Sequence, residues 1–219
     1  MNIYVLGSSH CRNIFSNENF GCINGVHNKS EIIRKWSSKG LHIKEAERNV
    51  DGYSMSKFVT NQRGGIEFCE NEIRCYVFGE IDIRVHAGTG RPYKKNVEGM
   101  VTLYLNKLPN NEKTFVIAVQ PPMCANNYQL LNKKMFRWDP ISSKVDYRPE
   151  MTNFMNKMLE ERCKANNMNF INPWASYELD ENGFLPLEQT DKVCHILDPS
   201  KALDEILGVI YKKFAIDNI

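Results

Sequence analysis

The feature that most constrains this chain is a regular alternation of short apolar runs with longer segments whose apolar residues recur at helical spacing. The apolar runs are continuous, which is typical of strands buried on both faces of a parallel sheet. We expect strands at 3–6, 41–45, 73–78, 114–119 and 168–171. Helices are predicted at 30–40, 95–108, 149–166 and 200–211. The pattern therefore predicts an α/β fold, a three-layer α/β/α sandwich with a mainly parallel, about five-stranded sheet of flavodoxin-like type.

The sequence shows no sign of a second domain. Its 219 residues contain no internal repeat, no low-complexity tract and no linker rich in Pro, Gly or Ser. A hydrophobic content of 42% is sufficient for one sizeable core. We expect a single domain over residues 1–219, with a long loop insertion at about 120–149.

Charge and hydropathy argue against several partners. The formal net charge is +2 with both signs well mixed, too small an excess to favour nucleic acid or an anionic membrane surface. No apolar run approaches the roughly 18–20 residues that span a bilayer. The amino terminus has no basic segment, long apolar region or small-residue cleavage site of the kind found in secretory signals. We expect a cytoplasmic protein with no nucleic acid and no membrane among its partners. The oligomeric state is left open.

Cysteine usage also favours a cytoplasmic protein. The seven cysteines are odd in number and form no CxxC pair, so reduced thiols are expected, with neither a disulfide framework nor a zinc site. A metal site built from His10, Asp82, His86 and His195 would match no standard ligand spacing. We therefore expect no metal and no cofactor.

Polar residues gather where the predicted strands end, which is where ligands bind in such sheets. Residues 7–12 follow the first strand, residues 79–86 follow the third, and residues 191–196 precede the last helix. Together they supply a hydroxyl, histidines and carboxylates, the groups needed for acyl transfer through a covalent serine intermediate. If residues 80–86 continue as a strand, one side would carry a polar row of Glu80, Asp82, Arg84 and His86.

The order and spacing of these motifs resemble the SGNH (GDSL-like) hydrolase superfamily. The shared features are a Gly-x-Ser after the first strand, a Gly-x-x-Asp after a middle strand and an Asp/His pair before the final helix. More narrowly, GSSH near the start and FGEIDIRVH in the middle resemble a subgroup that opens with GDSH and carries GEID-x-R-x-H. The likeness extends over most of the chain.

The resemblance implies roles for particular residues. Ser9 matches the nucleophile and His195 the catalytic base. Asp191, which lies shortly before His195, is our candidate for the acid that orients the base. Gly52 matches the glycine whose backbone N–H helps to form the oxyanion hole. Arg84, Asp82 and Arg148 complete the expected set of oxyanion, positioning and substrate contacts.

The chain departs from the family pattern at three positions. Ser8 stands where the family has the aspartate of GDS, and Ile81 stands where it has an oxyanion asparagine. Lys192 occupies the position three residues before His195, so Asp191 lies four before it. Three readings of the function stay open. The first is a serine esterase or acyltransferase whose substrate is a small-molecule or glycan ester, such as an O-acylated carbohydrate. The second is a non-catalytic SGNH-like domain that binds a glycan or a protein, and the third is a phosphate-handling flavodoxin-like protein.

Overall fold

The computed structural model describes residues 1–15, 29–45, 54–60, 72–83, 93–123, 147–190 and 196–215. Its centre is one parallel sheet with the strand order β2-β1-β3-β4-β5. The strands are β1 (Asn2–Gly7), β2 (His42–Glu45), β3 (Ile73–Val77), β4 (Thr114–Ile117) and β5 (Asn169–Ile171). β3 and β4 are fully buried, as continuous apolar runs require. The order is that of flavodoxin-like sheets, and the predicted fold class is confirmed.

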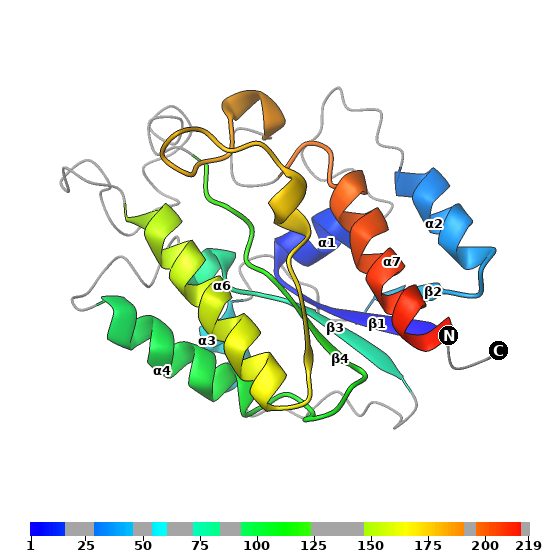
Figure 1. Cartoon of the computed structure of the whole chain (residues 1–219), viewed down its shortest axis with the longest axis horizontal. Coiled ribbons are helices and arrows are strands. Elements are labelled where there is room, and N and C mark those ends of the chain that lie inside the picture. Colours follow the sequence, from blue (N-terminus) through cyan, green and yellow to red (C-terminus); the bar gives the residue numbers. More distant parts are fainter. Residues whose placement is uncertain are drawn as a thin grey trace.

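Helices cover both faces of the sheet (Figure 1). One face carries α1 (Ser9–Phe15), α2 (Lys29–Ser37) and α7 (Ser200–Ala215), and the other carries α3 (Met55–Thr60), α4 (Tyr93–Leu105) and α6 (Arg148–Ala165). Two short 3₁₀ helices, Pro173–Ser176 and Leu187–Gln189, follow β5. Each face buries its own apolar cluster, so the sheet separates two cores. The predicted helices are confirmed within a few residues at their ends.

The long helix α6 illustrates how the apolar spacing becomes packing. Pro149 lies in the first turn, where its missing N–H costs no intrahelical hydrogen bond. A stripe of apolar side chains is buried against the sheet: Met151, Met155, Met158, Leu159 and Cys163. The methionines therefore fill the core, as their helical spacing predicts.

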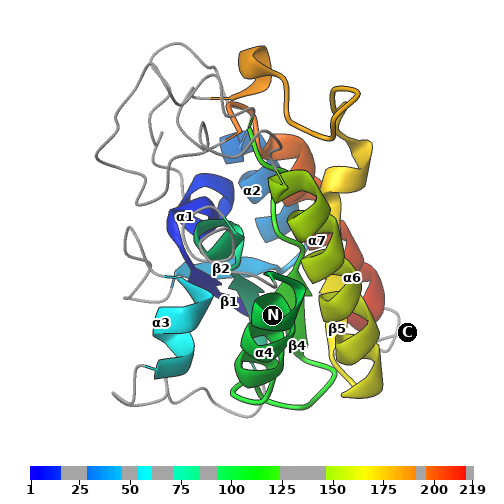
Figure 2. The same ribbon diagram turned by 90° about the vertical axis from the view of Figure 1, so that its left-hand side faces the viewer.

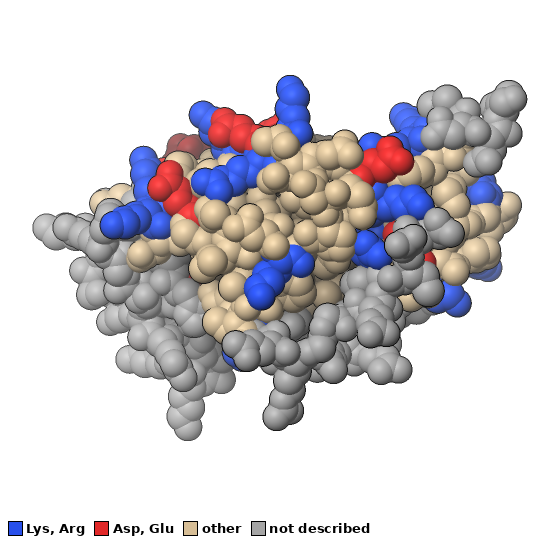
Figure 3. Space-filling model, turned by 90° about the horizontal axis from the view of Figure 1, so that it is seen from below, with Lys and Arg blue, Asp and Glu red and all other residues tan. Residues whose placement is uncertain are grey.

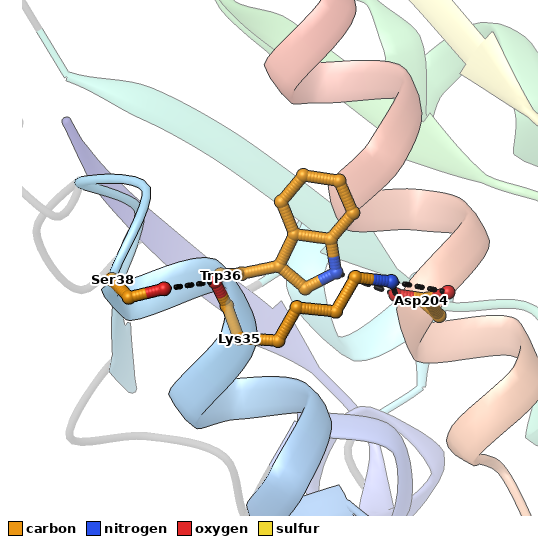
Figure 4. A network of polar contacts seen from close by, with 4 residues as sticks. All are labelled: Lys35, Trp36, Ser38 and Asp204. Carbon is orange, nitrogen blue, oxygen red and sulfur yellow. Dashed lines mark hydrogen bonds and ion pairs between the residues drawn. The ribbon is translucent and has the colours of Figure 1, made fainter.

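A polar contact joins α2 to α7 on the opposite face (Figure 4). Asp204 accepts hydrogen bonds from Lys35 Nζ at 2.7 Å and from Trp36 Nε1 at 2.6 Å. Partial burial alone would raise the pKa of Asp204, but these two hydrogen bonds and the charges of Lys35 and Lys39 outweigh it and lower the pKa below the usual value. The Trp36 ring packs on Tyr211 and lies in the α1/α2/α7 core. The contact fixes how α2 sits on α7.

The charged side chains, helices and cysteines of the described residues are distributed as in ordinary globular proteins. On the face shown in Figure 3, basic and acidic side chains are interspersed among the described residues. No helix in the described part of the chain has the length and hydropathy that a bilayer crossing requires. Cys11, Cys75 and Cys163 are buried free thiols. Burial raises the pKa of Cys163 to about 12, so this thiol stays protonated.

One local prediction is wrong. Residues 80–83 do not continue β3 as a strand, because β3 ends at Val77 and Gly79 adopts φ +111°, a conformation that favours glycine. Ile83 N–H then donates to Gly79 O at 2.9 Å, which closes a helical turn. Glu80 and Asp82 therefore do not share one side of a strand. Arg84 and His86 lie outside the described residues, as does most of the expected 120–149 insertion.

Candidate active site

The carboxyl ends of the central strands lie level at one edge of the sheet. Gly7 pairs with Val77 at the ends of β1 and β3, and Ile117 pairs with Ile171 at the ends of β4 and β5. Figure 2 looks toward this side of the molecule and shows α1 and α3 on opposite sides of β1. The chain segments that leave these strands therefore meet over one region, as the sequence predicts.

The turn after β1 is held tightly against β3. Ser8 N–H donates to Val77 O at 3.1 Å, and Cys11 N–H donates to Ser8 O at 2.9 Å. A Cβ at Gly7 would collide with Val77 O and would come within 2.7 Å of Cys11 Cβ, so only glycine fits here. Ser9 is the first residue of α1. The predicted nucleophile thus follows a turn whose backbone has little freedom.

A buried polar cluster lies beside Ser9. His10 Nδ1 is 3.5 Å from Ser8 Oγ and 3.7 Å from Glu80 Oε2, and Ser8, His10 and Glu80 are all buried. In a catalytic triad the base contacts the nucleophile and the acid through different ring nitrogens. Here the same nitrogen faces both groups. The cluster therefore braces the turn, and it is not a second Ser-His-Glu triad.

Asp82 fixes the start of α3. Its carboxylate is fully buried and accepts hydrogen bonds from Met55 N at 2.6 Å, Ser56 N at 3.0 Å and Ser56 Oγ at 2.8 Å. Ser54 Oγ accepts from Lys57 N at 3.1 Å, so the three leading N–H groups of the helix have acceptors. α3 begins three residues after Gly52. Asp82 thereby holds the helix that follows the predicted oxyanion glycine.

Arg148 is buried under the segment that leaves β4. Its Nη2 donates to Met123 O at 2.9 Å, and its guanidinium lies 5.7 Å from the centre of the Phe184 ring. Met123 also pairs with Leu185 in an isolated parallel bridge. With 2% of its surface exposed, Arg148 braces this edge of the sheet through the contacts described.

The segment that carries Asp191 and His195 lies outside the described residues, but its two neighbours are paired. Thr190 and Ile196 form an antiparallel bridge, and Leu197 N–H donates to Gln189 O at 2.8 Å. Thr190 and Ile196, the residues on either side of 191–195, are therefore held together. Asn13 Nδ2, from α1, donates to Ile196 O at 3.0 Å, which ties Ile196 to the helix that begins at Ser9.

The structure thus describes part of the predicted site. Asp82, Arg148 and the backbone of Ser9 have defined places, whereas Gly52, Arg84, Asp191 and His195 fall outside the described residues. Within the described ranges, no group of three or more His, Cys, Asp or Glu side chains is arranged to hold a metal ion. Sequence reasoning did not identify Asn13. Its one signal is its position four residues after Ser9, on the same side of a helix.

Comparisons with known proteins bear on the fold. No protein-family model matches the chain, and no curated protein does either. Solved structures do match. A lipase/acylhydrolase from Enterococcus faecalis is similar over 97% of this chain and 95% of its own, with 13% identity and a TM-score of 0.54. The two proteins therefore share a fold.

Two further structures share this fold. A GDSL-like lipase from Bacteroides thetaiotaomicron covers 98% of this chain and 88% of its own, with 15% identity and a TM-score of 0.53. A carbohydrate esterase of family 3 from Talaromyces cellulolyticus covers 97% and 98%, with 11% identity and a TM-score of 0.52. Because these matches cover nearly the whole of each chain, the likeness concerns the complete α/β/α sandwich and not a shared substructure.

Proposed function

We propose that this protein is a serine-dependent ester hydrolase or acyltransferase of the SGNH type, acting on an O-acylated carbohydrate. The observation that carries the proposal is the convergence at one sheet edge. The Gly7–Ser9 turn lies at that edge, Asp82 after β3 binds the start of α3, and Thr190 and Ile196, which flank residues 191–195, form a bridge. The neighbours with this fold include lipases and a carbohydrate esterase. The ester chemistry and the sugar substrate that we propose are in line with what these proteins are called.

In the proposed reaction Ser9 Oγ attacks the acyl carbon while His195 takes the hydroxyl proton. The tetrahedral oxyanion is stabilised by the backbone N–H groups of Ser9 and Gly52 and by Arg84. His195 then gives its proton to the departing sugar hydroxyl, and the C–O bond of the ester breaks. Water, or a second sugar hydroxyl, then attacks the acyl-enzyme and gives its proton to His195. The bond between the acyl carbon and Ser9 Oγ breaks, His195 returns the proton to Oγ, and the acid or the new ester leaves. Asp191 holds the imidazole throughout.

A second candidate is a non-catalytic glycan- or protein-binding domain, and one observation favours it. The family's oxyanion asparagine is Ile81 here, and the isoleucine side chain has no group that can donate a hydrogen bond. If the protein is an enzyme, another group must stabilise the oxyanion in place of the asparagine, and we assign this role to Arg84. Loss of one oxyanion donor typically costs about 10²–10³ in kcat, which makes Arg84 the deciding residue between the two candidates.

The test is hydrolysis of p-nitrophenyl acetate and release of acetate from acetylated xylan. Wild type is compared with Ser9→Ala, His195→Ala and Arg84→Ala. Ser38→Ala, which removes a hydroxyl at the far end of α2, is the matched control. We expect at least about a hundredfold loss in the first two variants and an unchanged rate in the control. Equal rates in wild type and Ser9→Ala would refute the hydrolase and support the binding domain.

A further inference from the structure

We propose that Glu80 is a positioning residue of this site, and that its carboxylate acts on the same atom of His10 that a carboxylate at position 8 would reach. The inference rests on the proposed function. His10 Nδ1 lies 3.7 Å from Glu80 Oε2 and 3.5 Å from Ser8 Oγ. The three residues are between 2% and 8% exposed. Because Ser8 and His10 are the two neighbours of Ser9 in the chain, this cluster holds the residues on both sides of the proposed nucleophile.

One imidazole nitrogen faces both position 8 and position 80. Position 8 carries a serine where the resemblance has the aspartate of GDS, so it supplies a neutral hydroxyl and no charge. The oxygens of an aspartate would extend one bond beyond the place of Ser8 Oγ, which brings them to Nδ1 of His10. One carboxylate at either position is therefore sufficient, and two would repel each other across a single nitrogen.

The turn after β3 fixes the position of Glu80. Gly7 and Val77 pair at the ends of β1 and β3, so the residues that follow these strands lie side by side. Gly79 redirects the chain with φ +111°, and a Cβ on it would lie 2.5 Å from Val119 Cγ2. Any other residue at position 79 would have to shift the turn. Glu80 therefore presents its carboxylate from a backbone with little freedom.

The carboxylate determines which ring nitrogen of His10 carries the proton. The distance of 3.7 Å is too long for a strong hydrogen bond, but a charge acts over this distance in a buried site. A carboxylate only accepts, so it favours the proton on Nδ1, and Ser8 Oγ then accepts from Nδ1 and from the His10 backbone N–H at 3.4 Å. Without the charge the proton moves to Nε2, and the Ser8 hydroxyl turns to donate to Nδ1.

Ser9 lies between the two residues whose contacts would change. Its backbone N–H, a proposed oxyanion donor, belongs to the peptide unit that joins it to Ser8. Ser8 N–H on Val77 O and Cys11 N–H on Ser8 O keep this turn in place, so loss of the carboxylate should shift Ser9 only slightly. A displacement of about 1 Å can cost about a hundredfold in rate, and a smaller shift should cost about tenfold in kcat.

The experiment is a double-mutant cycle on ester hydrolysis with Glu80→Gln, Ser8→Asp and the two combined. Glu80→Gln should lower kcat about tenfold and change KM less than about threefold. Ser8→Asp alone should also lower kcat, since two carboxylates then face Nδ1. The double variant should return kcat to within about threefold of wild type. Glu150→Gln is the matched control, because it neutralises an exposed carboxylate paired with Lys94, and its kcat should not change.

Additivity would overturn the inference. If the double variant loses the product of the two single losses, positions 8 and 80 do not share His10. A second readout needs no turnover and no variant at position 8. The imidazole ¹⁵N resonances of His10, assigned with His10→Asn, should report the proton on Nδ1 in wild type and on Nε2 in Glu80→Gln. An unchanged pattern in folded Glu80→Gln would equally refute the role of Glu80.

Failure of the proposed function is a separate result. If Ser9→Ala keeps full activity, the proposed function fails, and the ¹⁵N pattern still decides whether Glu80 acts on His10. If Ser9→Ala is inactive while Glu80→Gln is fully active, only the positioning role of Glu80 fails.

Discussion

Replacing Asp82 by alanine should destabilise the protein strongly, although Asp82 carries out no proposed chemical step. Its buried carboxylate accepts three hydrogen bonds from the first turn of α3. Alanine would leave Met55 N–H without this acceptor in a fully buried position, and an orphaned buried donor costs about 1–3 kcal/mol. The Ser56 groups are partly exposed, so water can replace part of their loss.

Together these contributions give about 3 kcal/mol for Asp82→Ala, toward the upper end of what single capping and hydrogen-bond losses cost. For a chain of this size that corresponds to a fall of about 6–12 °C in melting temperature. Asp82→Asn should lower the free energy of unfolding by less, about 2 kcal/mol. The amide oxygen can replace one carboxylate oxygen as an acceptor, but the amide nitrogen would face an N–H donor and cannot accept from it.

Urea unfolding followed by circular dichroism measures these differences. The control is Ser54→Ala, which removes a single acceptor from the same helix start and should cost about 1 kcal/mol. If Asp82→Ala loses no more stability than Ser54→Ala, the Asp82 carboxylate does not hold the start of α3. If Asp82→Ala loses more stability than Ser54→Ala, we also expect Asp82→Asn to lose more ester-hydrolysis activity than its loss of stability accounts for, because α3 follows Gly52.

Three further outcomes are expected. Gly7→Ala should abolish folding or activity, because its Cβ would collide with Val77 O; soluble expression and ester hydrolysis test this, and a fully active variant would contradict it. Asp204→Asn should cost about 0.2–1 kcal/mol at pH 7 by urea titration. Because the folded-state pKa of Asp204 is lowered, that difference should persist above pH 3.8 and shrink below it; a constant difference would refute the ionic contribution. Cys163, whose pKa is raised to about 12, should resist thiol reagents until the protein unfolds, and rapid native labelling would contradict its burial.

Several features of the site were open to sequence reasoning because they depend on residues close together in the chain. Gly7 and Gly79 directly follow strand-like apolar runs, and glycine at a strand end indicates a tight turn. The place of Ser9 follows from the same turn. The error at residues 80–83 has a related cause. Alternating polar residues favour a strand locally, but Gly79 adopts a positive φ and redirects the chain, and the sequence alone does not report a dihedral angle.

The amino-acid sequence by itself determined the layers, because apolar runs and helical spacing record which faces are buried, and burial is the dominant favourable free energy of folding. It also determined which chemical groups follow the strands. Only the tertiary structure decided which of these groups meet: that Asp82 holds α3, that Arg148 supports Met123 O, and that Asn13 reaches Ile196. These are hydrogen bonds between segments that are distant in the chain. Their partners are selected by the geometry of the assembled sheet edge, and no local pattern in the sequence encodes them.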